Sequence, residues 1–268
     1  MASQATTSQL QRFADRVRLR AVRMVAAHGF GYLGQALSSA ELLAALYGGP
    51  YRPGDDDLVC SPGHYIIGVF AAGVEAGLLD EEQLATYGQD GSALEAIGTE
   101  RSPAVDLTCG SLGQGLSGAV GFALSHRLRR EDGARVFTLV SDGELEEGQL
   151  WEAAMFAGHH RLANLVVVLD ANDSQVDGAV SSIVSVDPIA AKWRSFGWDA
   201  LDVDGHDVAA VAAALEAAVA SSRPTVVIGR TSTVHGLHVL PADADGHFIK
   251  LSADVADAAV AELEARLA

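Results

Sequence analysis

Residues 135–170 read RVFTLVSDGELEEGQLWEAAMFAGHHRLANLVVVLD, with an apolar and β-branched run at either end. Neither run, 135–140 or 165–169, alternates between polar and apolar residues, which is typical of strands buried on both faces. A helical pattern over 144–160 lies between the two runs. The stretch therefore predicts a strand, a helix and a second strand parallel to the first.

The same alternation continues on both sides of this unit, with a strand predicted at 225–228 and a short one at 58–60. The order predicts an α/β fold: a doubly wound, mostly parallel sheet with helices on both faces. Residues 88–108 lack a clean period and predict a long loop. The other helices are predicted at 8–27, 40–47, 66–76, 118–129, 188–196, 208–221 and 253–267, with Ser38 or Ser39 capping the second of these and Asp207 the sixth.

The composition narrows the class of function. The 268 residues include 35 acids against 18 Lys and Arg, and the net charge of −17 argues against binding to nucleic acid. The sequence has no apolar run of the roughly 18 residues that a membrane span needs. Its two cysteines, Cys60 and Cys109, can form neither a disulfide framework nor a zinc site. We expect a cytoplasmic protein acting on small molecules, with one domain over 1–240 and a C-terminal tail and helix over 241–268.

A glycine-rich segment at 110–118 opens one of the predicted helices. Its pattern Gly113-x-Gly115-x-x-Gly118 matches the dinucleotide-binding fingerprint, in which main-chain N–H groups approach a phosphate at a helix N-terminus. The chain has 28 glycines, so close packing of a helix on a strand explains the pattern equally well. Alone, the segment does not distinguish these two interpretations.

Polar clusters follow both runs of the opening stretch, at 141–148 and at 170–178. Taken separately they are an acidic helix cap and an Asx-rich turn. Because parallel strands end at the same edge of a sheet, Asp142 and Asn172 can converge there. A carboxylate, an amide oxygen and a loop carbonyl are hard ligands suited to Mg²⁺, which leaves positions open for phosphate oxygens. Such an ion would reconcile a phosphate ligand with an acidic protein.

Asp142-Gly143-Glu144 followed by Asn172 resembles the thiamine-diphosphate motif, with Ser141 in place of its first glycine. The similarity is to the transketolase family, and specifically to the separately encoded N-terminal subunit of split transketolases. It implies the thiamine-diphosphate-binding fold and transfer of a two-carbon ketol or acyl unit from a ketose or 2-oxo donor to an aldehyde or ketone, through a thiamine C2 carbanion. The segments that carry the resemblance are 37–47, 61–64, 110–116, 144–152, 192–198 and 203–207.

The resemblance also implies roles for individual residues. Asp142, Asn172 and the main-chain carbonyl of Ser174 would hold Mg²⁺. The residues placed around thiamine diphosphate are His64, Leu112, Gly113, Gly143, Glu144 and Asn172.

Three residues are implied in catalysis. His64 matches a family histidine near the diphosphate and the reacting centre, and Glu147 matches a glutamate that links two cofactor sites across the dimer. His247 aligns loosely with a substrate-side histidine, and a solvated histidine is the alternative there. The family also needs a glutamate from a pyrimidine-binding domain. We expect a C-terminal partner subunit to supply it, in an assembly of two copies of each chain (α2β2).

Two positions depart from the family pattern. Histidines that line the donor side in the family correspond to Tyr32 and, through the 88–108 loop, to Ile97. Isoleucine cannot bind the hydroxyl of a ketol unit, so we expect a donor altered from that of sugar-phosphate transketolases, such as a pyruvate-like or 1-deoxy-ketose donor.

Two other functions remain open on the sequence. An NAD-dependent oxidoreductase would use Gly113 to Gly118 on the pyrophosphate and Asp142 on a ribose, but it gives Asn172 and Glu147 no role. A non-catalytic transketolase-like partner subunit would keep the fold and lose turnover.

Overall fold

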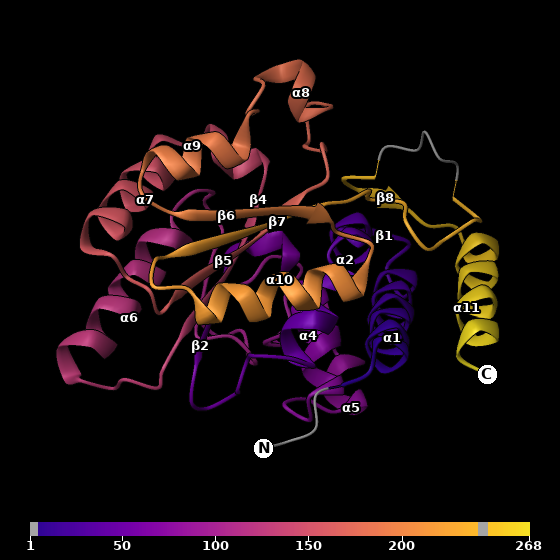
Figure 1. The fold of residues 1–268 in the computed structure, drawn as a ribbon. Coiled ribbons are helices and arrows are strands. Elements are labelled where there is room, and N and C mark those ends of the chain that lie inside the picture. The colour runs from indigo at the N-terminus through magenta and orange to yellow at the C-terminus, as the bar shows by residue number, and fades with distance from the viewer. Residues whose placement is uncertain (1–4, 241–245) are drawn as a thin grey trace.

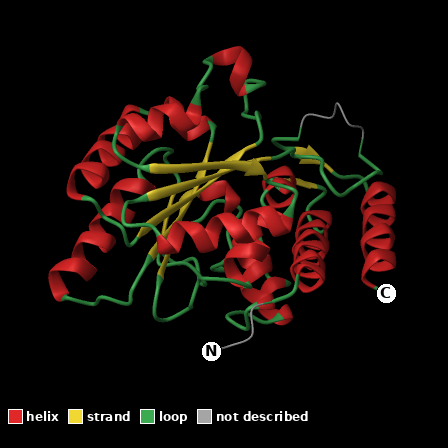
Figure 2. Ribbon diagram, in the orientation of Figure 1, coloured by secondary structure: helices red, strands yellow, loops and turns green. Residues whose placement is uncertain are grey.

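A computed structural model describes residues 5–240 and 246–268 of the chain. A six-stranded parallel sheet lies at its centre, with helices on both faces (Figures 1 and 2), which confirms the predicted α/β architecture. The strand order is β3-β2-β4-β5-β7-β6. The strands are β2 (Asp57–Pro62), β3 (Leu107–Cys109), β4 (Val136–Ser141), β5 (Leu165–Ala171), β6 (Asp199–Asp204) and β7 (Thr225–Arg230).

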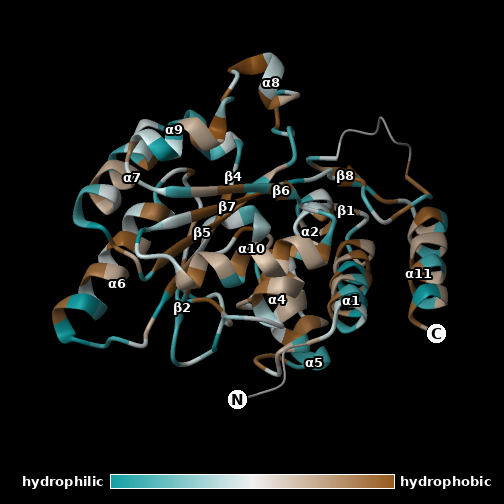
Figure 3. Cartoon of the chain, viewed as in Figure 1, coloured by the Kyte–Doolittle hydropathy of each residue, from teal (hydrophilic) through white to brown (hydrophobic). Residues whose placement is uncertain are grey.

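Two hydrophobic cores cover the two faces of the sheet. Every residue of β4 and β5 is buried, as the unalternating apolar runs predict, and Figure 3 shows these strands as largely hydrophobic. One face packs on α6 (Gly115–Arg129), α7 (Gly148–His160) and α9 (Ile189–Ser195). The other packs on α1 (Thr7–Ala26), α2 (Leu33–Ser38), α3 (Ala40–Tyr47), α4 (Ile66–Glu75) and α10 (Val208–Ala220).

The C-terminal helix joins the second of these cores. α11 (Ala253–Leu267) buries Ala256, Ala259 and Leu263, which belong to the same hydrophobic cluster as α1. Short strands β1 (Phe30–Gly31) and β8 (Ile249–Lys250) pair antiparallel beside it. The boundary predicted at residue 240 adjoins residues 241–245, outside the described part of the chain, and stays a prediction.

Several predicted elements differ in detail. The helix predicted over 144–160 is divided into a 3-10 turn, η2 (Gly143–Glu146), and α7, because the backbone of Glu147 is extended. Ser39 precedes α3 without capping it, since its hydroxyl donates to the carbonyl of Gln35. Asp207 does cap α10, accepting from two main-chain N–H groups at 3.0 and 3.1 Å. Short helices α5 (Glu81–Leu84) and α8 (Val180–Ile183) complete the fold.

The sheet topology places a crevice between β2 and β4. From β2 the chain crosses to β3 on one side, whereas β4 leads to β5 on the other. Such a switch point opens a crevice at the carboxyl ends of the two strands, where ligands bind in open α/β sheets. η1 (Gly63–Tyr65) follows β2 there, and η2 follows β4. Among the described residues, no helix is both long and apolar enough to cross a lipid bilayer.

Candidate functional site

A cavity of about 350 Å³ opens at this crevice. Loops that follow β2, β3, β4 and β5 form its walls, together with residues just after β1 and just before β8. The structure therefore brings together side chains that lie far apart in the sequence. The lining residues are Tyr32, His64, Ile97, Gly110, Leu112, Gly143, Glu146, Glu147, Gln175, Val176, Asp177 and His247.

Asp142 directly follows β4 and Asn172 directly follows β5, so both lie at the carboxyl ends of neighbouring strands; neither is among the residues that line this cavity. The oxygens of Asp142 accept from the main-chain N–H groups of Gly143 at 2.9 Å and Asp173 at 2.7 Å. The Oδ1 atom of Asn172 accepts from the N–H of Ser174 at 3.0 Å. Asp142 thus contacts the residue that follows Asn172, as expected from neighbouring strand ends, and the role of both residues as metal ligands stays a prediction.

The charges around Asp142 fit a divalent cation. Burial, and then the nearby charge of Asp170, raise the pKa of Asp142 to about 7. Among the described residues, neither of these two buried carboxylates forms an ion pair with a Lys or Arg. Hard oxygen donors beside uncompensated negative charge are the surroundings that Mg²⁺ requires.

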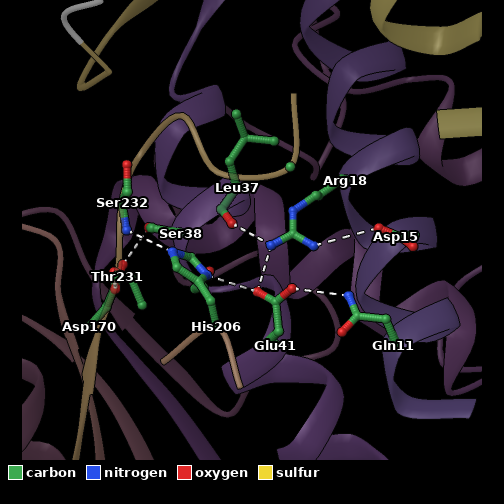
Figure 4. Close-up of polar contacts among 12 residues, drawn as sticks. Gln11, Asp15, Arg18, Leu37, Ser38, Glu41, Asp170, His206, Thr231 and Ser232 are labelled. Atoms are coloured by element: carbon green, nitrogen blue, oxygen red, sulfur yellow. Dashed lines mark hydrogen bonds and ion pairs between the residues drawn. The ribbon is translucent and has the colours of Figure 1, made fainter. Parts of the chain in front are cut away.

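Asp170 itself is a residue that the sequence reasoning missed. Its buried carboxylate accepts from the hydroxyls of Tyr65 at 2.9 Å, Ser38 at 2.5 Å and Thr231, and from the amide nitrogen of Asn172 at 3.0 Å. Figure 4 shows Ser38 and Thr231 next to it. The available signal was a carboxylate that ends an apolar run two positions before Asn172.

Glu144 is placed differently from the expectation that it binds the cofactor. It is 0% exposed and does not line the cavity. Its carboxylate accepts from Ser61 Oγ at 2.6 Å and from the N–H groups of Gly113 at 2.8 Å and Ser141 at 3.2 Å. Burial raises its pKa to about 7. Glu144 therefore fixes the Gly113 loop from beneath instead of facing the cavity.

The glycine pattern at 113–118 serves close packing. A Cβ on Gly115 would lie 2.5 Å from Ser61 Cα, and one on Gly118 would lie 2.2 Å from a methyl of Leu107. Gly113 has φ +77, and a Cβ there would lie 2.5 Å from the Cβ of Glu147. Gly113 thus allows its loop to touch Glu147 at the cavity wall. The packing interpretation of Gly115 and Gly118 is confirmed.

Aromatic rings form the other side of the cavity. The ring centroids of Tyr32 and His64 are 5.2 Å apart, those of His64 and His247 are 5.2 Å apart, and Tyr32 and His247 meet edge to face at 5.9 Å. Gln35 contacts His247 Nδ1 through its amide nitrogen at 3.1 Å. Burial, with a smaller effect of His247, lowers the pKa of His64 to about 3. His64 is therefore neutral at physiological pH.

Ile97 also lines the cavity, next to the glycines of two loops, Gly63 and Gly110. Its side chain is 42% exposed, and its Cγ2 is 3.0 Å from the position that a Cβ on Gly63 would take. Both positions that depart from the family pattern, Tyr32 and Ile97, line the same cavity. The donor-side role of Ile97 stays a prediction.

A second cluster, Glu41, His206 and His235, brings three possible metal ligands within 4.8 Å. The ligand atoms of Glu41 and His206 are already engaged, however. Arg18 donates to Glu41 at 2.5 Å, and His206 contacts Glu41 through Nδ1 at 3.2 Å and accepts from the N–H of Ser232 at 2.9 Å (Figure 4). The buried guanidinium would repel a cation, so this cluster links α1 and α3 to the loop after β7.

Comparison with known proteins identifies one family. The family described as transketolase, thiamine diphosphate binding domain, matches residues 9–266. The chain is similar to 6-deoxy-6-sulfo-D-fructose transketolase subunit SqwG of Clostridium sp. (strain MSTE9), at 37% identity over 95% of this chain and 96% of that protein. It is also similar to an apulose-4-phosphate transketolase subunit of Actinobacillus succinogenes, at 32% identity over 87% of this chain and 88% of that protein.

Solved structures agree with these relatives. The crystal structure of transketolase from Campylobacter jejuni subsp. jejuni matches with a TM-score of 0.88 and 27% identity. The match covers 97% of this chain and 43% of that chain, so the protein spans less than half the length of that transketolase.

Proposed function

This chain belongs to the transketolase family through its thiamine diphosphate-binding domain, and we propose that it is the diphosphate-binding subunit of a two-component transferase. The observation that carries the proposal is the pair Asp142 and Asn172, held together beside a cavity that also presents His64 and His247. The nicotinamide alternative loses its support, because the family match covers residues 9–266 and this alternative gives Asn172 and Glu147 no role.

In this proposal the chain's own residues bind and orient the cofactor, which supplies the nucleophilic carbon that accepts the two-carbon unit. Asp142, Asn172 and the main-chain carbonyl of Ser174 hold Mg²⁺, which neutralises the diphosphate in a protein of net charge −17. Gly143 leaves the backbone accessible to the diphosphate, and Leu112, with Gly113, faces the middle of the cofactor.

The catalytic side chains act at the other end of the cavity. His64, neutral because of its burial, exchanges hydrogen bonds with a reacting oxygen without adding a charge. His247 contacts it on the substrate side. Glu147 lines the cavity beside Gly113 and is proposed to link two cofactor sites across the assembly.

The remaining catalytic group comes from a partner. The relatives named above are called subunits, which supports a partner subunit here too. We propose a pyrimidine-binding subunit that contributes a catalytic glutamate, in an assembly of two copies of each chain.

The donor is proposed to be a two-carbon unit without the usual hydroxyl, such as acetyl from a pyruvate-like or 1-deoxy-ketose donor. Ile97 supports this, because an apolar side chain on the cavity wall suits a methyl group and cannot bind a hydroxyl. The names of the relatives favour a second candidate, ordinary ketol transfer from a modified sugar. The two candidate donors are distinguished by measuring kcat/KM of the assembled enzyme with three substrates: pyruvate, a 1-deoxy-ketose phosphate and a ketose phosphate. A preference for the ketose phosphate would establish the second candidate.

The cofactor assignment is tested by thermal unfolding of the chain with thiamine diphosphate and Mg²⁺, against NAD. Ligand at 100 times its dissociation constant stabilises the native state by about 2.7 kcal/mol. We expect a higher Tm with thiamine diphosphate plus Mg²⁺ and no change with NAD. An unchanged Tm at saturating thiamine diphosphate and Mg²⁺ would contradict the assignment.

A further inference from the structure

The side-chain amide of Asn172 has one orientation in the structure. Its nitrogen donates to Asp170 Oδ2 at 3.0 Å and to the hydroxyl of Tyr65 at 2.8 Å, with Ser38 Oγ at 3.3 Å. Its oxygen accepts from the N–H of Ser174 at 3.0 Å. The nitrogen of the amide therefore points into the protein, and the oxygen points toward the loop that carries the proposed metal site.

The donors around Asp170 enforce that orientation. A hydroxyl has one hydrogen to donate and lone pairs to accept. Ser38 and Tyr65 give their hydrogens to Asp170 and accept from the nitrogen of Asn172, so the two hydroxyls and the amide close on one carboxylate oxygen. Thr231 donates to the other oxygen. All the groups around the carboxylate donate hydrogen bonds to it. An ionised carboxylate can only accept, so these surroundings suit the ionised form of Asp170.

A reversed amide would be unfavourable on both sides. The oxygen of Asn172 would then face Asp170 Oδ2 at about the 3.0 Å that now separates nitrogen from oxygen. The amide nitrogen would face the N–H of Ser174, and two donors cannot bond to each other. Both losses fall on buried polar groups, where an unmade hydrogen bond is costly.

We propose that Asp170 is a positioning residue for the cation site: it does not bind the ion, but it holds the Asn172 amide so that the oxygen faces the ion. Asp170 Oδ2 accepts from three donors and Oδ1 from the hydroxyl of Thr231, whereas each oxygen of Asp142 accepts from a single main-chain N–H. Asp142 therefore has the freer oxygens, and we take Asp142 and Asn172 as the side-chain ligands. Its buried negative charge adds to the attraction for a divalent cation. This inference rests on the proposed function, because it takes Asp142 and Asn172 as metal ligands.

The first test measures metal affinity without reference to activity. The probe is Mn²⁺ with saturating thiamine diphosphate on the full chain, with free Mn²⁺ followed by its electron paramagnetic resonance signal. Asp170→Asn keeps the shape of the side chain but allows the side-chain amide of Asn172 to flip, which exchanges its oxygen and nitrogen. We expect Mn²⁺ to bind roughly 10–100-fold more weakly, as is typical when a residue supporting a metal ligand is changed.

A matched control separates this effect from loss of a buried aspartate in general. Asp56 is 4% exposed and bonds Arg52 and the N–H of Arg135, at the opposite ends of the strands. Asp56→Asn should lower the stability of the fold and leave the Mn²⁺ affinity unchanged. Equal weakening of Mn²⁺ binding by both variants would overturn the proposal.

A double-mutant cycle tests the orientation itself. A carboxylate presents two equivalent oxygens, so Asn172→Asp removes the need to orient the ligand. In that background Asp170→Asn should have little effect on Mn²⁺ affinity, or restore it, because the new amide can donate to the new carboxylate. An equal loss in both backgrounds would contradict a positioning role.

The failure of the inference and that of the proposed function have different signatures. If the unaltered chain binds Mn²⁺ and Asp170→Asn binds it equally well, only the role of Asp170 is wrong. If the unaltered chain binds no Mn²⁺ with thiamine diphosphate, both are wrong.

Discussion

Asp142 is a buried carboxylate whose partners are two main-chain N–H groups. Its raised pKa, about 7, reflects the cost of its charge in the protein without a bound cation. Asp142→Asn should therefore leave the Tm of the ligand-free chain unchanged or slightly higher. Thiamine diphosphate with Mg²⁺, at 100 times its dissociation constant, should raise the free energy of unfolding of the unaltered chain by about 2.7 kcal/mol. Asp142→Asn should remove this gain.

The control for this variant is a neighbouring acid whose carboxylate is already bonded to another residue. Asp173 bonds the N–H and hydroxyl of Ser181. Asp173→Asn keeps a residue that tolerates the positive φ of 55° at this position. The Tm of Asp173→Asn should still rise with thiamine diphosphate and Mg²⁺. Differential scanning fluorimetry of both variants measures this rise. Retained stabilisation in Asp142→Asn would refute its role as a ligand.

Ile97 carries the prediction on donor choice. Ile97→His restores a hydrogen-bond donor on the cavity wall, and one well-placed donor contributes roughly 3 kcal/mol to a transition state. In the assembled enzyme we expect kcat/KM for a ketose phosphate to rise at least about tenfold relative to pyruvate. Ile97→Leu keeps an apolar wall and should leave the ratio unchanged. If Ile97→His has the same ratio of kcat/KM for the ketose phosphate to kcat/KM for pyruvate as the unaltered enzyme, Ile97 does not determine the choice of donor.

The sequence predicts the proximity of two residues when the order of the strands in the sheet determines it. Asp142 and Asn172 end consecutive strands, so their proximity follows from a parallel sheet. The surroundings of Asp170 do not follow in this way. Its donors come from α2, from η1 and from the loop after β7, and only the folded chain brings Ser38, Tyr65 and Thr231 together.

Among the elements, α1 and α3 are joined by a buried ion pair between Arg18 and Glu41. Burial alone would raise the pKa of Glu41, but the charge of Arg18, with hydrogen bonds from His206 and Arg18, outweighs it and lowers the pKa to about 2. Glu41→Gln leaves the buried guanidinium with only its longer ion pair, to Asp15 at 3.7 Å. We expect the free energy of unfolding to fall by about 3–5 kcal/mol, measured by urea denaturation at pH 7.

The same pair predicts a pH dependence. Glu41 has a lower pKa in the folded state, about 2, than its ordinary 4.5, so its contribution is complete above 4.5 and is lost as the pH falls toward 2. The difference in unfolding free energy between the unaltered chain and Glu41→Gln should therefore shrink over that window. A difference that stays constant from pH 7 to pH 3 would show that the carboxylate charge is not responsible.

Prediction of the elements succeeded where burial leaves a pattern in the chain. β4, β5 and β7 are apolar runs buried on both faces, and all three were predicted. β6 was missed because it is an edge strand whose sequence, DALDVD, alternates with acids and is only partly buried. β3 also lies at an edge. Residues 107 and 108 were predicted as the end of a loop, but pairing with β2 places residues 107–109 in the sheet.

For the whole molecule, the proposed function makes the cavity one part of a larger active site. Its walls come from one thiamine diphosphate-binding domain, and the chain covers 43% of a transketolase of known structure. Exposed apolar side chains lie on or near its rim, with Ile97 42%, Phe248 41% and Val176 75% exposed. Apolar side chains this exposed around a cavity are typical of a surface that a partner covers.

The last prediction follows from this incompleteness. The purified chain should bind thiamine diphosphate and Mg²⁺ yet show no turnover, because we propose that a partner supplies the group that activates the cofactor. Co-expression with a pyrimidine-binding subunit should give a heteromer with two copies of each chain by size-exclusion chromatography with light scattering, and turnover should appear only in that fraction. Turnover by the chain alone at a rate comparable to the mixture would show that the site is complete without a partner.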